Sequence, residues 1–275
     1  MAKTYSTIDV FKFLFCIMII ALHTRVATIL PSTAEYSIRM VLFRLAVPFF
    51  FIASGFFLGE KLRKVDVKEQ TRIILTYCKR LLVPLIVFEV INLIELNVGM
   101  IWKGRTLPWI LLWDIKSIIF YPRGALWFVQ ACIIGALLLL PFLRYKKMLL
   151  ALSLGCVLYC FALICNNYFF IVEGTAIENI VKGYMSLCYT ARNGLFVGFV
   201  MLTIGVCCSY YRERISKRQT LILSMFFFAL NIVEIVFLYD KHHIDDEALY
   251  EIAKISDGGM RDSINFLDQL RSFSN

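Results

Sequence analysis

Seven apolar stretches, each near the length that crosses a lipid bilayer, constrain this chain more than any other feature. An α-helix needs about 20 residues to cross about 30 Å of hydrocarbon. The stretches are continuously apolar rather than alternating, which favours helices over a β-barrel. The sequence therefore predicts an all-α, polytopic transmembrane helix bundle whose spans cover residues 8–30, 41–60, 81–100, 124–143, 148–166, 194–211 and 219–239.

The first stretch follows the sequence MAKTYSTID, in which a lysine precedes the apolar run as it does in a secretory signal peptide. No small-residue cleavage site follows, and the run is longer than the apolar part of a signal peptide. We therefore expect this stretch to remain in the protein as its first span.

The net charge of +9 is distributed unevenly along the chain. Basic residues outnumber acidic ones up to residue 239, and they concentrate in the connections 61–80, 144–147 and 211–218. The positive-inside rule places such connections in the cytoplasm. We therefore predict a multi-pass inner-membrane protein with a cytoplasmic N-terminus and outer loops at 101–123 and 167–193.

Two partner classes follow from the same composition. The lipid bilayer is the expected partner of the apolar stretches. No basic face is interleaved with exposed aromatic residues, so we do not expect the membrane part to bind nucleic acid.

The nine cysteines mostly lie inside apolar stretches, which is typical of small buried hydrophobic residues rather than of disulfides or a metal site.

Residues 240–275 differ from the rest of the chain. They are acidic overall, and their apolar residues have the spacing of two helices separated by Gly258 and Gly259. The segment is too short to bury a core of its own. We therefore divide the chain into a transmembrane domain, residues 1–239, and a short helical tail, residues 240–275.

His23 is the one histidine in residues 1–239. An imidazole in hydrocarbon is costly unless it faces a polar cavity, so His23 is either a functional group or a histidine that hydrogen-bonds between helices. Lys12 lies eleven positions earlier, about 16 Å along the same helix face, and Asp9 can pair with it. Lys12 alone is also typical of a cation that reaches toward the interface.

Further polar residues lie at a depth similar to that of His23. Pro48, Ser54 and Gly55 in the second span are expected to serve helix packing. The candidate functional residues in the outer half of the bundle are Arg44, Glu95, Trp127, Arg192, Asn193 and Glu234. Spacing establishes only a shared depth, and the hypothesis is that His23, Arg44, Glu95, Arg192 and Glu234 line one outward-facing polar chamber.

The segments IDVFKFLFCIMIIALHT, FRLAVPFFFIASGFFL, KRLLVP, GALWFVQACIIG and ARNGLFVGF resemble membrane acyltransferase family 3 over about residues 5–239. The most specific element is a basic residue followed by ten residues and a histidine, which Lys12 and His23 match. Within the family, TARNGLF and the span that carries Glu234 are most similar to the membrane half of vancomycin-resistance serine racemases.

The resemblance implies an acyltransferase that moves groups other than amino-acyl groups. It would transfer an acyl group, usually acetyl, from acyl-CoA as co-substrate to a cell-envelope glycan or a small hydroxyl acceptor, with no bound cofactor and no metal. His23 would be the base, together with the predicted catalytic residues Arg44, Glu95 and Glu234. The residues predicted to bind substrate or CoA are Lys12, Arg80, Trp127, Arg192 and Asn193.

The sequence departs from the family pattern at two places. An arginine pair three positions apart often precedes the third span, whereas Thr76 and Tyr77 stand before Lys79 and Arg80. Family members usually have about ten spans, whereas seven are predicted here.

The tail resembles the second-sensor region of the gamma/tau clamp-loader subunit of bacterial DNA polymerase III, with Arg261 as its arginine, but the chain has no phosphate-binding loop.

Three functions stay open at this stage. The first is an acyltransferase that O-acetylates an acceptor. The second is a serine transporter-like membrane module, since the vancomycin-resistance relatives are thought to supply serine to an attached racemase domain. The third is an inactive truncated fusion, because an incomplete bundle would expose polar faces to lipid.

Overall fold

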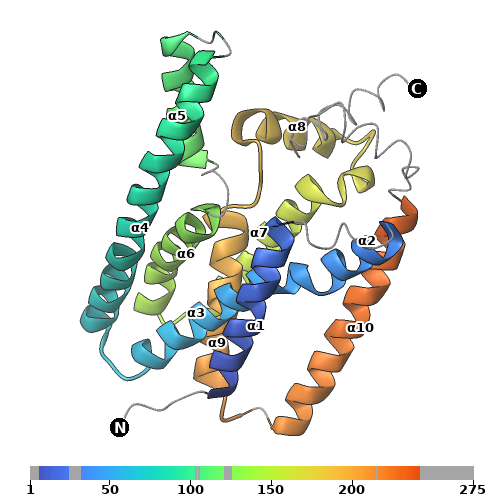
Figure 1. The fold of residues 1–275 in the computed structure, drawn as a ribbon. Helices are drawn as coiled ribbons and strands as arrows, with labels where there is room; N and C mark the ends of the chain where they lie inside the picture. Colours follow the sequence, from blue (N-terminus) through green and yellow to red (C-terminus); the bar gives the residue numbers. More distant parts are fainter. Residues whose placement is uncertain are drawn as a thin grey trace. The chain divides into compact units, whose positions relative to one another are not determined.

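The computed structural model describes residues 6–24, 32–102, 104, 106–120, 126–214 and 216–241. Every regular element in these ranges is helical, which confirms the all-α prediction (Figure 1). The predicted tail helices and Arg261 lie outside the described residues. The helices, in chain order, are α1 (Ser6–His23), α2 (Ser32–Val41), η2 (Phe43–Leu45), α3 (Ala46–Leu62), α4 (Val67–Trp102), α5 (Leu107–Phe120), α6 (Leu126–Arg144), α7 (Met148–Asn166), η3 (Phe169–Ile171), α8 (Ala176–Cys188), η4 (Gly194–Gly198), α9 (Phe199–Tyr211) and α10 (Lys217–Lys241).

Six helical segments in the described part of the chain are long and apolar enough to cross a membrane. They correspond to six of the predicted spans, and the stretch 81–100 lies within the continuous helix α4. The polytopic helix bundle is therefore confirmed. The six segments are Ser6–His23, Ser37–Leu62, Leu126–Arg144, Met148–Asn166, Gly194–Tyr211 and Lys217–Phe237.

Two connections predicted as outer loops, 101–123 and 167–193, contain helices that the sequence did not predict. Helix α5 has 14 residues, about 21 Å, which is too short to cross the hydrocarbon alone. Helix α8 has 13 residues and ends at Tyr189, whose φ of 60° breaks the helix. Both helices are shorter than a span, which is why a search for span-length apolar runs missed them.

The chain divides into two compact units, which we describe separately. The first comprises Met1–Ile19 and Leu45–Thr220, and the second comprises Ile20–Arg44 and Leu221–Asn275. In the first unit, α9 packs against α3, α6 and α7, and α4 packs against α6. The buried core of this unit lies among these helices and includes Phe51, Leu139, Phe199 and Leu202.

Small residues bring the core helices of the first unit into backbone contact. A Cβ atom at Gly205 of α9 would overlap the carbonyl oxygen of Ile52 of α3, and one at Gly198 would overlap the carbonyl oxygen of Ala131 of α6. Lipid tails are as apolar as leucine, so helices in a membrane associate through such close packing rather than through the hydrophobic effect. The prediction that Gly55 serves packing is confirmed, since a Cβ there would overlap the backbone of Leu202.

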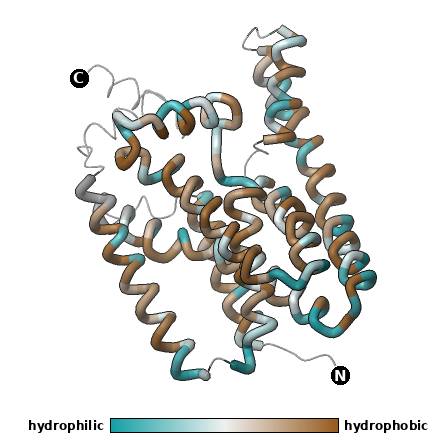
Figure 2. Tube along the Cα trace, turned by 180° about the vertical axis from the view of Figure 1, so that it is seen from behind, coloured by the Kyte–Doolittle hydropathy of each residue, from teal (hydrophilic) through white to brown (hydrophobic). Residues whose placement is uncertain are grey.

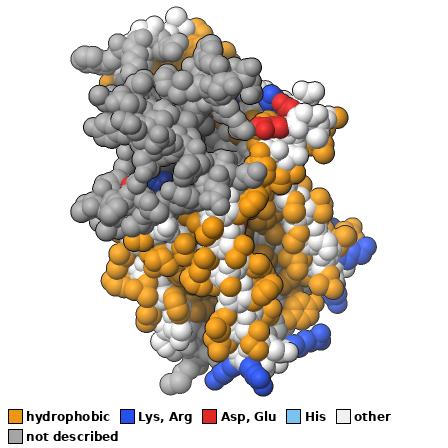
Figure 3. All heavy atoms as spheres, turned by 90° about the vertical axis from the view of Figure 1, so that its right-hand side faces the viewer, with side chains coloured by type: hydrophobic (Ala, Val, Ile, Leu, Met, Phe, Trp, Pro, Cys, Tyr) orange, Lys and Arg blue, Asp and Glu red, His pale blue; other side chains and the backbone are white. Residues whose placement is uncertain are grey.

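The helix surfaces have the character expected of a membrane protein. Hydrophobic residues run along the helices while hydrophilic ones gather at helix ends and turns (Figure 2). The described part of one face is covered by apolar side chains, with lysine and arginine side chains at its lower edge (Figure 3). Many large apolar residues are exposed on α4, α5, α7 and α10. Exposed apolar surface of this extent suits contact with lipid rather than water.

The nine cysteines are all free thiols, and only part of the prediction for them holds. Cys78, Cys132, Cys165, Cys188 and Cys207 are buried, as expected. The other four are exposed on helix surfaces. The composition of an apolar run does not show which of its residues face the core and which face lipid, so these four could not be distinguished from the buried ones. These four are Cys16, Cys156, Cys160 and Cys208.

Candidate functional site

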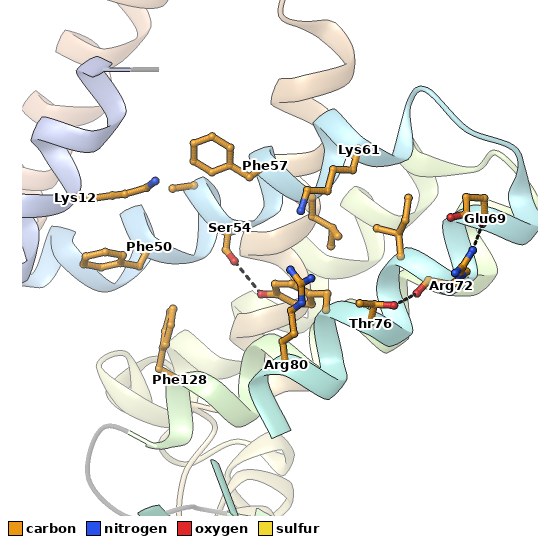
Figure 4. Close-up of a pocket in the computed structure, with 14 residues that line it drawn as sticks. Lys12, Phe50, Ser54, Phe57, Lys61, Glu69, Arg72, Thr76, Arg80 and Phe128 are labelled. Atoms are coloured by element: carbon orange, nitrogen blue, oxygen red, sulfur yellow. Dashed lines mark hydrogen bonds and ion pairs between the residues drawn. The ribbon is translucent and has the colours of Figure 1, made fainter. Parts of the chain in front are cut away.

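A cavity of about 620 Å³ in the first unit brings together basic, aromatic and hydroxyl side chains (Figure 4). Helices α3 and α4 supply most of its lining, with one residue from α1 and one from α6. The lining residues are Lys12, Phe50, Ala53, Ser54, Phe57, Leu58, Lys61, Glu69, Arg72, Ile73, Thr76, Tyr77, Arg80 and Phe128.

The turn between α3 and α4 positions the two main walls. The Asp66 carboxylate accepts a hydrogen bond of 3.1 Å from the backbone N–H of Glu69 at the start of α4, a common helix-capping contact. The Gln70 side chain donates to the carbonyl oxygen of Leu62 at the end of α3, at 3.0 Å. On α3 the glycine face meets α9, so Ser54, Phe57 and Lys61, three or four residues apart, share the face that lines the cavity.

The charge of the cavity is predominantly positive. Its lining contains Lys12, Lys61, Arg72 and Arg80 against a single carboxylate, that of Glu69. Arg72 pairs with this carboxylate at 3.5 Å. Lys61 and Arg80 form no ion pair with any residue in the described ranges, so their charges are available to a ligand. Basic side chains grouped in this way suit phosphate groups.

Lys12 links the cavity to α1. Its ammonium pairs with Asp9 at 3.0 Å, as the three-residue spacing predicted, and lies 4.3 Å from the centre of the Phe57 ring. Lys12 and Arg80, both predicted at the CoA end, line the same cavity. Since α1 is continuous from Ser6 to His23, His23 follows Lys12 by eleven residues, about 16 Å along the helix.

The remaining predicted residues of the first unit lie elsewhere. Trp127 is half-buried, with its ring centroid 6.0 Å from that of Phe51 in the core. Glu95 on α4 and Arg192 before η4 are exposed. The cavity therefore contains two of the predicted substrate-binding residues, Lys12 and Arg80, and none of Trp127, Glu95 and Arg192.

Asn193 serves the fold. Its side-chain oxygen accepts hydrogen bonds from the backbone N–H groups of Leu195 and Phe196, at 3.0 and 3.2 Å, which caps the π-helical turn before α9. Its amide nitrogen donates to the Tyr184 hydroxyl at 3.0 Å, and Tyr184 donates to the Thr190 carbonyl at 3.1 Å. Burial raises the pKa of Tyr184, which keeps this hydroxyl protonated. These bonds connect α8 to the start of α9.

His23, Arg44 and Glu234 belong to the second unit. His23 is exposed at the end of α1, Arg44 is half-buried in η2, and Glu234 is half-buried on α10. The hypothesis that these three share one chamber with Glu95 and Arg192 stays a prediction. No group of histidine, cysteine, aspartate and glutamate that could hold a metal ion occurs among the residues that the structure describes.

Several cavity residues were not predicted from the sequence. Ser54 was assigned to helix packing, and Lys61, Arg72 and Tyr77 were not assigned to a site, although all four line the cavity. A spacing signal was present: Glu69, Arg72, Thr76 and Arg80 recur at intervals of three or four residues and so share one face of α4. Apart from Arg80, which was predicted to bind CoA, the basic connection 61–80 was interpreted only as an orientation signal.

Comparison with known proteins is consistent with this architecture. The family model described as "Acyltransferase domain" matches residues 5–257. The chain is 26% identical to a serine/alanine racemase of Enterococcus gallinarum and 30% identical to an amino-acid racemase of Enterococcus faecalis, over 78% and 79% of this chain. It spans about 30% of the length of each of these relatives. No solved structure matches.

The helix bundle, the Lys12–His23 spacing on one continuous helix and the family match over nearly the whole transmembrane part agree with one another. The chain therefore belongs to the acyltransferase domain family of multi-pass membrane proteins.

Proposed function

We propose that this protein transfers an acyl group from acyl-CoA to a hydroxyl group of a cell-envelope acceptor. The observation that carries the proposal is the cavity with four basic side chains and one carboxylate, which provides cations for the phosphates of CoA. Lys12 in this cavity and His23 lie on the same helix, eleven residues apart, which is the spacing of the basic residue and histidine in the family resemblance.

In the proposed reaction, the imidazole of His23 accepts the proton of the acceptor hydroxyl. The hydroxyl oxygen then attacks the thioester carbonyl carbon, and the carbon–sulfur bond breaks. The imidazolium returns the proton to the departing thiolate, so the products are the ester and free CoA. In this scheme Arg44, Glu95 and Glu234 are candidates for orienting the imidazole or the acceptor, and Arg192 for binding the acceptor.

The proposed orientation has the N-terminus in the cytoplasm of a bacterial cell. An ion pair of 2.8 Å between Glu60 and Arg212 joins the C-terminal ends of α3 and α9, so the basic connections that follow these helices lie at one end of the first unit. Such a concentration of basic residues favours the cytoplasmic side. The cavity, which includes Lys61 and Arg72 near this end, would then be accessible to cytoplasmic acyl-CoA.

The test is acetyl transfer from labelled acetyl-CoA in membranes that contain the full chain. We expect His23→Ala and Arg80→Ala to lose most of the transfer, His23→Ala at saturating donor and Arg80→Ala chiefly at low donor concentration. Lys79→Ala is the matched control, because Lys79 is exposed beside Arg80 on α4 but does not line the cavity. Equal transfer by all variants would contradict the proposal.

A second candidate function is an amino-acid-binding or transporting membrane module. The racemase names of the relatives favour it, since this chain matches only part of each of them. Uptake or binding of labelled serine without any requirement for acyl-CoA, together with absent acetyl transfer, would support this function over the first.

A further inference from the structure

The cavity has two chemically different ends. Lys61, Arg72 and Arg80 form a basic end. Ser54 precedes Lys61 by seven residues, about 10 Å along α3. Around Ser54 lie the aromatic rings of Phe50, Phe57 and Phe128, together with the Lys12 ammonium, which is paired with Asp9 and lies 4.3 Å from the centre of the Phe57 ring. A ligand that fits both ends has an anionic head and a largely neutral arm.

Besides Lys12, whose ammonium is already paired with Asp9, two hydroxyls supply hydrogen-bonding groups beside these rings. Ser54 Oγ and Tyr77 Oη lie 2.8 Å apart, on α3 and α4 (Figure 4). The Thr76 hydroxyl, by contrast, already donates to the carbonyl oxygen of Arg72 at 2.8 Å. The Ser54–Tyr77 hydroxyl pair is thus a polar group within reach of a ligand that binds Arg80, which lies about one turn from Tyr77 on α4.

Counting protons shows that the pair can still donate. Two hydroxyls carry two protons, and the bond between them uses one. The Cys132 thiol beside Tyr77 is a weak partner at best. The second hydroxyl proton is therefore available to an acceptor atom in the cavity.

A neutral carbonyl group meets the requirements of this position. A carbonyl oxygen beside these aromatic rings needs a hydrogen bond to offset its loss of water, and the hydroxyl pair can donate one. The arm of CoA carries amide carbonyls and ends in the thioester carbonyl, whereas its nucleotide head carries the phosphates.

We infer that the Ser54–Tyr77 hydroxyl pair hydrogen-bonds a carbonyl oxygen of the donor's arm while Lys61 and Arg80 bind the phosphates of its head. This inference rests on the proposed function and assigns its donor site a second, neutral anchor. The pair binds and positions the arm, and the basic residues supply the attraction for the head.

Two probes separate the two anchors. CoA has both the head and the arm, whereas adenosine 3′,5′-bisphosphate keeps phosphates and lacks the arm. Binding of each probe to the purified full chain in detergent is measured for the wild type, Tyr77→Phe, Ser54→Ala and Arg80→Ala. Tyr210→Phe is the matched control, because this half-buried tyrosine on α9 does not line the cavity.

We expect Tyr77→Phe and Ser54→Ala to weaken CoA binding about 3- to 10-fold, the loss of one hydrogen bond, and to leave binding of the bisphosphate unchanged. Arg80→Ala should weaken the binding of both probes, and Tyr210→Phe should weaken neither. Ser54→Ala keeps the test decisive if Tyr77→Phe fails to fold.

Several outcomes would overturn the inference. Unchanged CoA binding in both hydroxyl variants, or an equal loss for CoA and the bisphosphate, would show that the pair does not contact the arm, and the proposed function would stand. If the wild type bound neither probe, the proposed function itself would fail. The two failures are therefore distinguishable.

Discussion

Ser209 on α9 donates a hydrogen bond of 2.7 Å to Glu60 on α3, and Arg212 pairs with the same carboxylate at 2.8 Å. Arg63 adds a third contact at 3.3 Å. The Glu60 carboxylate therefore interacts with three side chains near the C-terminal ends of α3 and α9. This cluster fixes the α3 wall of the cavity to α9.

Replacing Glu60 with alanine should destabilise the protein by about 2–4 kcal/mol, because two guanidinium groups lose their carboxylate partner in a partly buried position. The measurement is thermal unfolding of the purified protein in detergent. Glu213→Ala is the control, since that side chain is 77% exposed and its pairs with Arg63 and Arg212 are long. An equal effect of both variants would argue against the central role of Glu60.

Gly205→Ala should destabilise the α3–α9 pair by about 1–3 kcal/mol, as overpacking does in cores, because the new methyl group would overlap the backbone of Ile52 and Phe56. The matched change is Gly183→Ala in α8, where nothing lies within 4 Å of the added Cβ. That change should stabilise the helix by up to about 1 kcal/mol. Thermal unfolding of the two variants should therefore shift in opposite directions.

Glu69→Gln should strengthen binding of phosphate ligands to the cavity. The substitution removes the only carboxylate of the lining and releases Arg72 from its ion pair. We expect about threefold tighter binding of CoA at low salt and a smaller difference at high salt, because ions screen partly exposed charges. Binding titrations at two salt concentrations check this, and weaker binding by the variant would contradict a basic phosphate site.

Asn193→Ala should lower stability by about 1–2 kcal/mol through the loss of the cap before α9. Asn193→Asp keeps the accepting oxygen and should retain part of that stability, although it loses the donor to Tyr184. Thermal unfolding checks the order wild type, aspartate, alanine. If the alanine variant were as stable as the wild type but lost acceptor binding, the original assignment of Asn193 to substrate binding would be the better one.

Glu178 in α8 gives a pH-dependent contribution to stability. Hydrogen bonds from Lys182 and from the backbone N–H of Gly174 hold the pKa of this carboxyl below its usual 4.5. A lowered folded-state pKa means that the contribution is present above pH 4.5 and is lost as the pH falls through the folded value. The difference in Tm between wild type and Glu178→Gln should therefore shrink at acidic pH, and a difference that grew would contradict the assignment.

The apolar stretches predicted the spans because the length that crosses a membrane is set by bilayer thickness and can be counted in the sequence. Helices α5 and α8 were not predicted, because each is shorter than a membrane span. The shared location of Lys12 and Arg80 was predicted from the family resemblance. The placement of Ser54 in the cavity depends on α3 turning Gly55 toward α9, a tertiary contact that helical spacing alone does not specify.

The predicted outer chamber depends on a property that the sequence does not specify, namely how each helix is rotated about its axis. Depth along a helix follows from residue number, so His23, Arg44 and Glu95 could be assigned to one level. Rotation of each helix about its axis depends on which face its neighbours cover, and this decides whether side chains meet. Asn193 shows the consequence, since at the predicted depth it caps a helix and bonds Tyr184.

Helix α4 has 36 residues and is therefore about 54 Å long, whereas the hydrocarbon layer is about 30 Å thick. Its apolar stretch begins near residue 81, so the turns that carry Glu69, Arg72 and Arg80 extend beyond that layer. A reactant that binds along these turns can keep its charged groups hydrated throughout. The solubility of such a reactant in lipid then sets no limit on its use, and only the uncharged portion of the molecule has to enter the bilayer.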